Sequence, residues 1–279
     1  MSSILAPIHY NIFEKVKKRL FWLLFKSLDT QEFYKLLHKR TLAAMNYGNG
    51  DDVATSGEMI AIDYIAKKMG NNPDKYIIFD IGANIGKYTQ ILCDRFGKLA
   101  EIHTFEPSVE TFSALKDNIG EKHNVVLNNI GLSDKVCTLP LFSDSKTSGL
   151  TSVYDRRLDH FNIQIQPIGE ASFDTLDRYC EHANIQHIHF MKMDVEGHEI
   201  SVLKGAKKML EENSIDYIQF EFGGCNIDSR TFFQDFWYIL HDKYHIYRIL
   251  QNGLYEITNY SEELEVFICS NFLAEQKSM

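Results

Sequence analysis

Short apolar runs alternate with amphipathic segments through the middle of the chain. The apolar runs that we expect to form strands cover residues 76–81, 101–106, 124–129, 189–195 and 215–220. The segments with helical spacing cover residues 58–69, 85–96, 109–119, 173–182 and 199–210. Strands that alternate with helices of this length indicate a parallel sheet built from βαβ units. Residues 133–172 are polar and irregular, and no element is predicted there.

The end of the chain follows a different pattern. Two apolar segments, 244–251 and 254–258, flank Asn252-Gly253, which is a strong short signal for a β-hairpin. Residues 265–270 form a last expected strand. We therefore expect an α/β fold whose mostly parallel sheet ends in an antiparallel hairpin.

The first 50 residues differ from the rest in pattern and charge. Residues 10–27 place apolar side chains at helical spacing among lysines, a second helix is expected over 31–45, and 47–56 reads as a loop. Residues 1–45 carry a net charge of +5, whereas the remainder sums to −14. A basic amphipathic helix either lies on an anionic membrane surface or packs its apolar stripe on the main domain or a second subunit. We expect residues 1–50 to form a helical extension and residues 51–279 the main domain.

Composition narrows the class of protein. The 279 residues carry a formal net charge of −9 in an ordinary globular composition, which excludes a disordered or collagen-like chain. The acidic total disfavours a general nucleic-acid-binding protein. The longest apolar run, residues 20–25, is too short for a membrane span or a signal-peptide core, so we expect a cytoplasmic protein, peripheral to the inner face of the membrane if the basic helix binds there. The five cysteines stand singly, which fits reduced thiols and disfavours a zinc ribbon.

A glycine-rich turn follows the first predicted strand, in the segment FDIGANIGKYT at 79–89. Gly82 and Gly86 allow a tight turn and the close approach of a ligand, and the next helix directs its free N–H groups at that ligand. The spacing is G-x-x-x-G and not the G-x-G-x-x-G of dinucleotide sites. Asp80 would repel a pyrophosphate but suits an amino group. S-adenosylmethionine therefore fits this turn better than NAD.

An acidic residue closes the second predicted strand, 24 residues after Gly82. Glu106, in the segment TFEP, is placed to accept hydrogen bonds from both ribose hydroxyls of a nucleoside cofactor. The alternative is an exposed carboxylate at the end of a strand, with no ligand. The pairing of Glu106 with the glycine turn favours the cofactor.

The segment FMKMDVEGHEI at 190–200 places three carboxylates and an imidazole at and just after the end of a strand. Methyl transfer to a hydroxyl needs a base that removes the hydroxyl proton, and Asp194, Glu196 or His198 could serve. Alternatively, Asp194 and Glu221, which closes the next strand, could hold a divalent cation that acidifies the hydroxyl. A purely local role is the third alternative, with Glu196 and Glu199 favouring a helix N-terminus and Gly197 relieving a turn.

These motifs together resemble the FkbM family of S-adenosylmethionine-dependent methyltransferases. The matching segments, in family order, are FDIGANIGKYT, TFEPS, NNIGLSD, SGLTS, FDTLD and MKMDVEGHE with LKGA after it. They run from about residue 76 to 225, and DVEGHE is the most specific of them. The resemblance implies a Rossmann-like class I methyltransferase fold and O-methylation, frequently of sugars. The cofactor-binding residues that it implies are Asp80, Gly82, Ala83, Asn84, Gly86, Tyr88, Glu106, Pro107 and Asn129.

The sequence thus predicts an O-methyltransferase that acts on a hydroxyl, with a glycan or small molecule as acceptor and no nucleic acid. The irregular stretch 133–172 is expected to form part of the acceptor pocket. Its candidate residues are Ser148, Thr151, Ser152, Tyr154, Arg156 and Arg157. Two alternatives from other classes stay open, an NAD-dependent oxidoreductase and a non-catalytic nucleoside-binding module. A homo-oligomer is compatible with the pattern.

Overall fold

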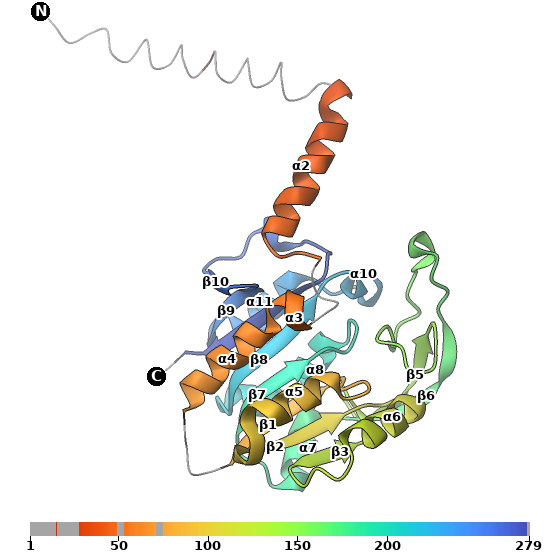
Figure 1. Cartoon of the computed structure of the whole chain (residues 1–279), viewed down its shortest axis with the longest axis vertical. Helices are drawn as coiled ribbons and strands as arrows, with labels where there is room; N and C mark the ends of the chain where they lie inside the picture. Colours follow the sequence, from red (N-terminus) through yellow and green to blue (C-terminus); the bar gives the residue numbers. More distant parts are fainter. Residues whose placement is uncertain (1–14, 16–27, 49–52, 71–74, 278–279) are drawn as a thin grey trace, which may run out of the picture. The chain divides into compact units, whose positions relative to one another are not determined.

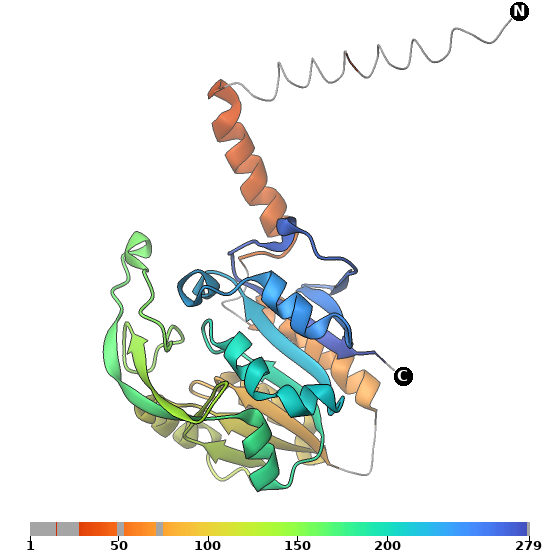
Figure 2. The ribbon, with the colours of Figure 1, turned by 180° about the vertical axis from the view of Figure 1, so that it is seen from behind.

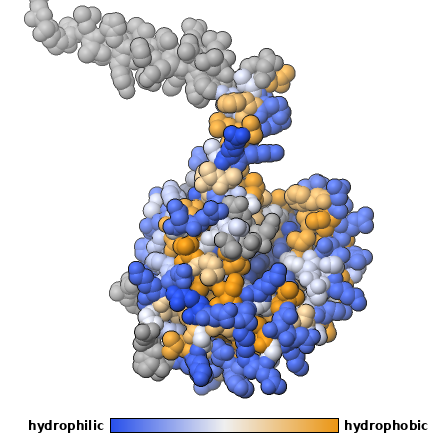
Figure 3. Space-filling view, in the orientation of Figure 1, coloured by the Kyte–Doolittle hydropathy of each residue, from blue (hydrophilic) through white to orange (hydrophobic). Residues whose placement is uncertain are grey.

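The computed structural model describes residues 15, 28–48, 53–70 and 75–277. The predicted amphipathic helix at 10–27 therefore lies outside the described residues, apart from Lys15. The chain divides into two units, Met1–Met45 and Asn46–Met279. In the first unit, a 3-10 turn over Leu28–Thr30 leads into helix α2, Gln31–Ala44, which confirms the helix predicted there. Hydrophobic and hydrophilic residues lie side by side on α2 (Figure 3).

The second unit is built on an eight-stranded sheet with the order β10-β9-β11-β8-β7-β1-β2-β3 (Figure 1). Its five parallel strands are β1 (Tyr76–Ile81), β2 (Ala100–Phe105), β3 (Val125–Asn128), β7 (Ile188–Met193) and β8 (Ile215–Phe222). The remaining strands are β9 (Tyr244–Leu250), β10 (Gly253–Ile257) and β11 (Ser270–Gln276). Strand β11 runs antiparallel to both β8 and β9, and β9 and β10 form the predicted hairpin. The expected Rossmann-like class I methyltransferase fold, with its mostly parallel sheet, is confirmed.

Helices cover both faces of this sheet because the central strands carry mostly apolar side chains on both sides. On one face, α4 (Glu58–Met69) and α5 (Lys87–Phe96) pack around Ile78, Ile102 and Phe190. The opposite face, seen in Figure 2, carries four helices. They are α7 (Leu176–Ala183), α8 (Glu199–Gly205), α9 (Lys207–Glu211) and α11 (Phe233–Leu240). Helix α6 (Val109–Ile119) agrees with its predicted bounds and packs beside the glycine turn.

A second, three-stranded sheet occupies part of the stretch for which no element was predicted. Its order is β4-β6-β5, with β4 at Gly131–Leu132, β5 at Cys137–Ser143 and β6 at Gln166–Asp174. The predicted start of the next helix, at residue 173, was wrong, because Phe173 is a buried residue of β6. Helix α7 begins after Thr175, whose side chain accepts a hydrogen bond from the Arg178 N–H and caps it.

Other boundaries also differ from the prediction. The helix expected over 199–210 is divided into α8 and α9 near Gly205, where a Cβ would lie 2.0 Å from the Ser133 carbonyl oxygen. The last strand lies at Ser270–Gln276 and not at 265–270. Three helices were not predicted, α3 (Val53–Ser56, inside the expected loop), α10 (Cys225–Ser229) and α11. Among the described residues, no helix is long and apolar enough to cross a membrane.

Candidate active site

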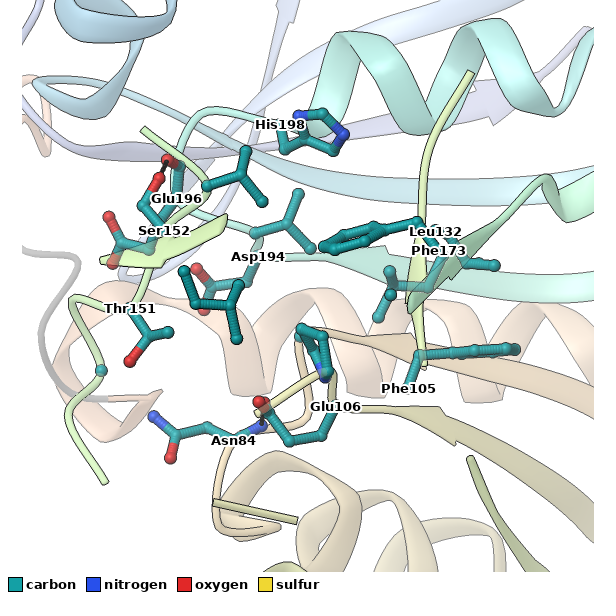
Figure 4. A pocket seen from close by; sticks show the side chains of 18 of the residues that line it. Asn84, Phe105, Glu106, Leu132, Thr151, Ser152, Phe173, Asp194, Glu196 and His198 are labelled. Carbon is teal, nitrogen blue, oxygen red and sulfur yellow. Dashed lines mark hydrogen bonds between the residues drawn. The ribbon is translucent and has the colours of Figure 1, made fainter. Parts of the chain in front are cut away.

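Two hollows meet at the carboxyl ends of the parallel strands. The first, which we call the donor cavity, lies among the ends of β1, β2 and β7 and the start of the second sheet (Figure 4). The second and larger, which we call the acceptor cleft, is lined by segments from 156–161, 224–230 and 267–269. Gly149, Asp194 and Glu196 line both. Ligands of open α/β sheets bind at this edge, so the arrangement places two binding regions next to each other.

The glycine turn closes the floor of the donor cavity. Gly82 has a φ of 79°, and its N–H donates to the Phe105 carbonyl at 2.9 Å. A Cβ on Gly82 would lie 1.9 Å from the Asp194 carbonyl oxygen, so only glycine fits between the ends of β1 and β7. Asp80 is fully buried beneath the turn and accepts a hydrogen bond from Thr89 Oγ1 at 2.6 Å. Its Oδ1 has no hydrogen-bond partner among the described residues, and burial raises its pKa while Lys192 lowers it.

Glu106 lies in the wall of the donor cavity beside Asn84 (Figure 4). Its Oε2 accepts the Asn84 N–H at 3.1 Å and its Oε1 accepts the Ser108 N–H at 2.9 Å. Burial raises its pKa to about 7, although the two N–H donors oppose the shift. A carboxylate oxygen can accept more than one hydrogen bond, and each Glu106 oxygen accepts one in this structure. Glu106 therefore retains the capacity to accept from vicinal hydroxyls, as a ribose would present them.

Only part of the predicted cofactor set lines the donor cavity, namely Gly82, Asn84, Glu106 and Pro107. The other predicted residues, Asp80, Ala83, Gly86, Tyr88 and Asn129, lie behind it.

The residues behind the cavity have local partners. Tyr88 turns into the core on α5 and donates to Gln219 at 2.9 Å. The Asn129 side chain donates to the backbone carbonyls of Glu106, at 2.9 Å, and Pro107. A Cβ on Gly86 would lie 2.7 Å from a methyl group of Leu115, so Gly86 permits α6 to approach. Tyr88 and Gly86 thus hold the turn and its neighbours in place and are not among the residues that line the donor cavity.

The apolar side of the donor cavity was not predicted. Phe105, Leu132, Leu141 and Phe173 line it, and three of these four come from the second sheet. Flat apolar walls of this kind suit an adenine ring. Phe173 belongs to the segment FDTLD, so the family motif already contained this residue. The direction of its side chain, however, depends on strand β6, which the sequence pattern did not predict.

The buried Glu199 side chain stabilises the DVEGHE loop by accepting hydrogen bonds from its backbone. The Glu199 carboxylate is fully buried, and its Oε1 accepts the Val195 N–H at 2.9 Å. Glu196 has a φ of 51° and Gly197 a φ of 100°, so the chain reverses sharply between β7 and α8. This reversal directs the Asp194 and Glu196 side chains to the boundary between donor cavity and acceptor cleft.

Glu196 is the carboxylate with the most perturbed surroundings at this boundary. Its side chain forms an ion pair with the buried guanidinium of Arg156, and its backbone carbonyl accepts a hydrogen bond from Ser152 Oγ at 2.8 Å. Burial and the neighbouring Asp194 raise its pKa to about 8, against the opposing effect of Arg156. A carboxylate with a pKa near the working pH is well suited to accept a proton.

His198 has little freedom to act as a base. Its Nδ1 is 3.1 Å from the Tyr154 hydroxyl and its Nε2 is 2.9 Å from Ser133 Oγ, so both ring nitrogens have partners. Burial lowers its pKa to about 4, which keeps the ring neutral at physiological pH. Its ring lines the donor cavity near Phe173. The geometry therefore fits a residue that holds the loop to the second sheet.

The irregular stretch, which we expected in the acceptor pocket, contributes to both hollows. Ser148, Thr151 and Ser152 line the donor cavity, and Arg156 and Arg157 line the acceptor cleft. Tyr154 lies behind them against His198. The far wall of the cleft, formed by 224–230 and 267–269, was not predicted in detail.

Asp194 and Glu221, which we expected as possible ligands of a divalent cation, are poorly suited to bind one. Asp194 Oδ2 already pairs with Lys192 Nζ at 3.0 Å. Burial and Asp194 raise the pKa of Glu221 well above its usual range, which disfavours the ionised carboxylate that a cation would bind.

Within the described residues, the one group of three ligand-type side chains close enough for a metal is His187, His189 and Asp216. Its members belong to the starts of β7 and β8, away from the donor cavity. There, His189 Nδ1 accepts the Ile77 N–H at 3.0 Å, which leaves the proton on Nε2 and no free lone pair for a metal.

Comparison with known proteins agrees with this geometry. The model of the methyltransferase FkbM domain matches residues 80–256. Methyltransferase 1 of Beauveria bassiana is 30% identical over 149 residues, which cover 48% of this chain and 59% of that protein. The 2-O-methyltransferase NoeI of Sinorhizobium fredii is 26% identical over 156 residues, with coverages of 52% and 63%. The hexuronic acid methyltransferase AglP of Haloferax volcanii is 27% identical over 145 residues, with coverages of 51% and 54%.

The matched parts span less than two thirds of the length of each of these three relatives. The family match is more extensive, since it covers more than half of this chain. It begins at Asp80 under the glycine turn and includes Glu106, the second sheet and the DVEGHE loop. The chain belongs to the FkbM family of methyltransferases.

Proposed function

We propose that this chain transfers a methyl group from S-adenosylmethionine to a hydroxyl group of a sugar, in a polysaccharide, a glycolipid or a glycosylated metabolite. The observation that carries the proposal is the position of Glu196, a carboxylate with a pKa of about 8 at the boundary between the two hollows. The names of two relatives, a 2-O-methyltransferase and a hexuronic acid methyltransferase, support a sugar as acceptor.

The residues present fit the proposed donor. Glu106 would accept hydrogen bonds from the ribose hydroxyls, the apolar wall with Phe105 and Phe173 would hold the adenine, and the turn at Gly82 would bring backbone close to the ligand. Asp80, whose Oδ1 accepts no hydrogen bond among the described residues and lies 4.0 Å from the Lys192 ammonium, places a carboxyl group beneath the turn. S-adenosylmethionine supplies, when bound, an electrophilic methyl group on a sulfonium.

Glu196 is the proposed general base. In this displacement the oxygen–methyl bond would form as the methyl–sulfur bond breaks, S-adenosylhomocysteine would be the leaving group, and the Glu196 carboxylate would accept the hydroxyl proton. Arg156 favours the ionised form of Glu196 and holds its side chain in place. His198 and Glu199 fix the loop on which Glu196 lies. Most of the catalytic effect would come from this positioning, because a one-step displacement requires alignment of its partners.

The decisive experiment is a methyl-transfer assay with radiolabelled S-adenosylmethionine and a panel of free sugars, nucleotide sugars and uronic acids. Label in a sugar product that yields a methyl ether on hydrolysis would support the proposal. Label in a carboxyl ester or in nucleic acid would contradict it. Calorimetric titration with NAD in parallel addresses the oxidoreductase alternative, and donor binding without transfer to any acceptor would favour the non-catalytic module.

Binding of S-adenosylhomocysteine is expected to depend on pH through Glu106. Because burial raises the pKa of Glu106 to about 7, and ribose hydroxyls donate to its ionised form, affinity should be constant above pH 8. It should fall as the pH drops through 7, to about a tenth of the plateau value at pH 6. Calorimetry from pH 5.5 to 8.5 measures this. Glu106→Gln should bind about ten- to a hundredfold more weakly and without the pH dependence; a wild-type curve that is flat across pH 7 contradicts the assignment.

The N-terminal unit is proposed to attach the protein to an anionic membrane surface. In α2, the apolar side chains of Phe33, Leu36 and Leu37 are exposed, and residues 1–45 carry a net positive charge. Deletion of residues 1–45 should abolish sedimentation with vesicles of anionic lipid and leave adenosylhomocysteine binding unchanged. Vesicles of neutral lipid are the control. Loss of a dimer on deletion, with no change in sedimentation, would instead support subunit packing.

A further inference from the structure

A row of polar side chains crosses the core directly beneath the active site. Asp80, Lys192 and Gln219 are register partners on the adjacent parallel strands β1, β7 and β8. All three are buried, with relative exposures of 0%, 5% and 0%. They lie on the sheet face that α4 and α5 cover, among apolar neighbours such as Ile78 and Phe190. A buried row of this kind is costly to desolvate and needs a compensating role.

Each member of the row has a partner from the covering helices. Thr89 Oγ1 of α5 donates to Asp80 at 2.6 Å. Gln219 accepts from the Tyr88 hydroxyl at 2.9 Å and donates to Glu58 of α4 at 2.7 Å. The Lys192 ammonium lies 4.9 Å from the centre of the Tyr88 ring, a cation–π contact. The row is therefore held on both sides and leaves Lys192 little room to move.

Among the described residues, Lys192 is the only cation that forms an ion pair with Asp80 or with Asp194. Its Nζ lies 3.0 Å from Asp194 Oδ2 and 4.0 Å from Asp80 Oδ1. Asp80 lies beneath the donor turn, whereas Asp194 is partly exposed at the boundary of donor cavity and acceptor cleft. The two strand ends also touch through the backbone, since the Asp194 N–H donates to the Ile81 carbonyl at 3.0 Å.

We propose that Lys192 is a positioning residue for methyl transfer, which holds the Asp194 carboxylate at the boundary of the two hollows and ties it to Asp80 beneath the donor turn. This inference rests on the proposed function. Without the ammonium, Asp194 would be free to rotate toward solvent, and Asp80 would have no cation partner among the described residues. Donor binding would weaken because the acid beneath the donor turn loses its partner, and transfer would slow because the Asp194 carboxylate would move away from Glu196, the proposed base.

The test separates this role from simple charge compensation in the core. Lys192→Met alone leaves the buried Asp80 and Glu58 without a cation, and this variant can fail to fold. The double variant Lys192→Met with Glu58→Gln removes the ammonium together with one of the buried acids that it compensates, so that fewer acids are left without a cation. Glu58→Gln alone is the matched control, since Glu58 contacts Gln219 and Ser56 and lines neither hollow.

Four quantities are measured for each folded variant: the melting temperature, the affinity for adenosylhomocysteine, and kcat and KM with the acceptor that the wild type methylates. We expect the control to behave like the wild type. The double variant should melt near the control, bind adenosylhomocysteine about tenfold more weakly, and lose about a hundredfold in kcat, with acceptor KM changed less than kcat.

The outcomes distinguish the two proposals. If the double variant recovers wild-type binding and kcat together with its melting temperature, Lys192 serves only to balance charge and the inference is wrong. A loss confined to the melting temperature leads to the same conclusion. If the wild type itself neither binds adenosylhomocysteine nor methylates any acceptor, the proposed function fails, and the role of Lys192 fails with it.

Discussion

Glu196→Gln is expected to lower kcat by about 10²- to 10⁴-fold while affinity for adenosylhomocysteine stays within about threefold of the wild type. The substitution keeps the size of the side chain and its ability to accept a hydrogen bond from Arg156, but it removes the only function that the proposed mechanism requires of this residue, the acceptance of a proton. A steady-state assay with a sugar acceptor, together with calorimetry, separates the two effects.

The comparison with His198→Asn decides between the two candidate bases. Asparagine retains one donor and one acceptor for Tyr154 and Ser133, so the loop should stay attached to the second sheet. We expect this variant to lose less than about tenfold in kcat, because the imidazole has both nitrogens occupied and its pKa is lowered to about 4. A larger loss for His198→Asn than for Glu196→Gln would contradict the assignment of Glu196.

The pH profile gives an independent check of the same residue. A base must be ionised to act, so kcat/KM of the wild type should rise with pH and reach half of its plateau near the Glu196 pKa of about 8. The Arg156 cation lowers that pKa. Arg156→Met should therefore move the rising limb to higher pH, and a limb that moves to lower pH or disappears would exclude Glu196 as the titrating group.

The core of the fold could be predicted because its strands are apolar on both faces and end at recognisable turns. The bounds of β1, α4 and α6 agree with the pattern for this reason. The second sheet could not be predicted in the same way. Much of β6 is exposed, and its buried residues Ala171 and Phe173 come only near its end, so the segment shows no run of apolar residues. The apolar wall of the donor cavity depends on this sheet and was missed with it.

The site was predictable where a motif places a side chain directly at a strand end. Glu106, Asp194 and Glu196 are such residues, and all three line the donor cavity. Tyr88 belongs to the glycine motif but faces the core, because its helical position on α5 points toward β8. A role for Lys192 was not predicted, because nothing in the local sequence indicates one. A single lysine in an apolar strand carries no periodic signal, and its partner Asp80 is 112 positions away in the chain.

Gly82→Ala is expected to abolish adenosylhomocysteine binding and to destabilise the main domain strongly. The new Cβ would lie 1.9 Å from the Asp194 carbonyl oxygen and 2.8 Å from its carbonyl carbon, and backbone atoms cannot yield as a flexible side chain can. The ends of β1 and β7 would have to separate. That movement breaks the hydrogen bond from Asp194 N–H to the Ile81 carbonyl and displaces the donor turn and the Asp194 carboxylate together.

Gly120→Ala is the matched control for this prediction. Gly120 also has a positive φ, of 61°, but a Cβ there meets nothing within 4 Å. Its replacement should cost about 1–3 kcal/mol of stability from backbone strain alone and leave ligand affinity unchanged. Chemical denaturation and calorimetry of both variants distinguish the cost of backbone strain at a positive φ from the steric clash of the new Cβ with the Asp194 carbonyl. If Gly82→Ala behaved like Gly120→Ala, the close contact between the strand ends would not be what requires glycine at 82, and the coupling of donor turn to Asp194 would lose its main support.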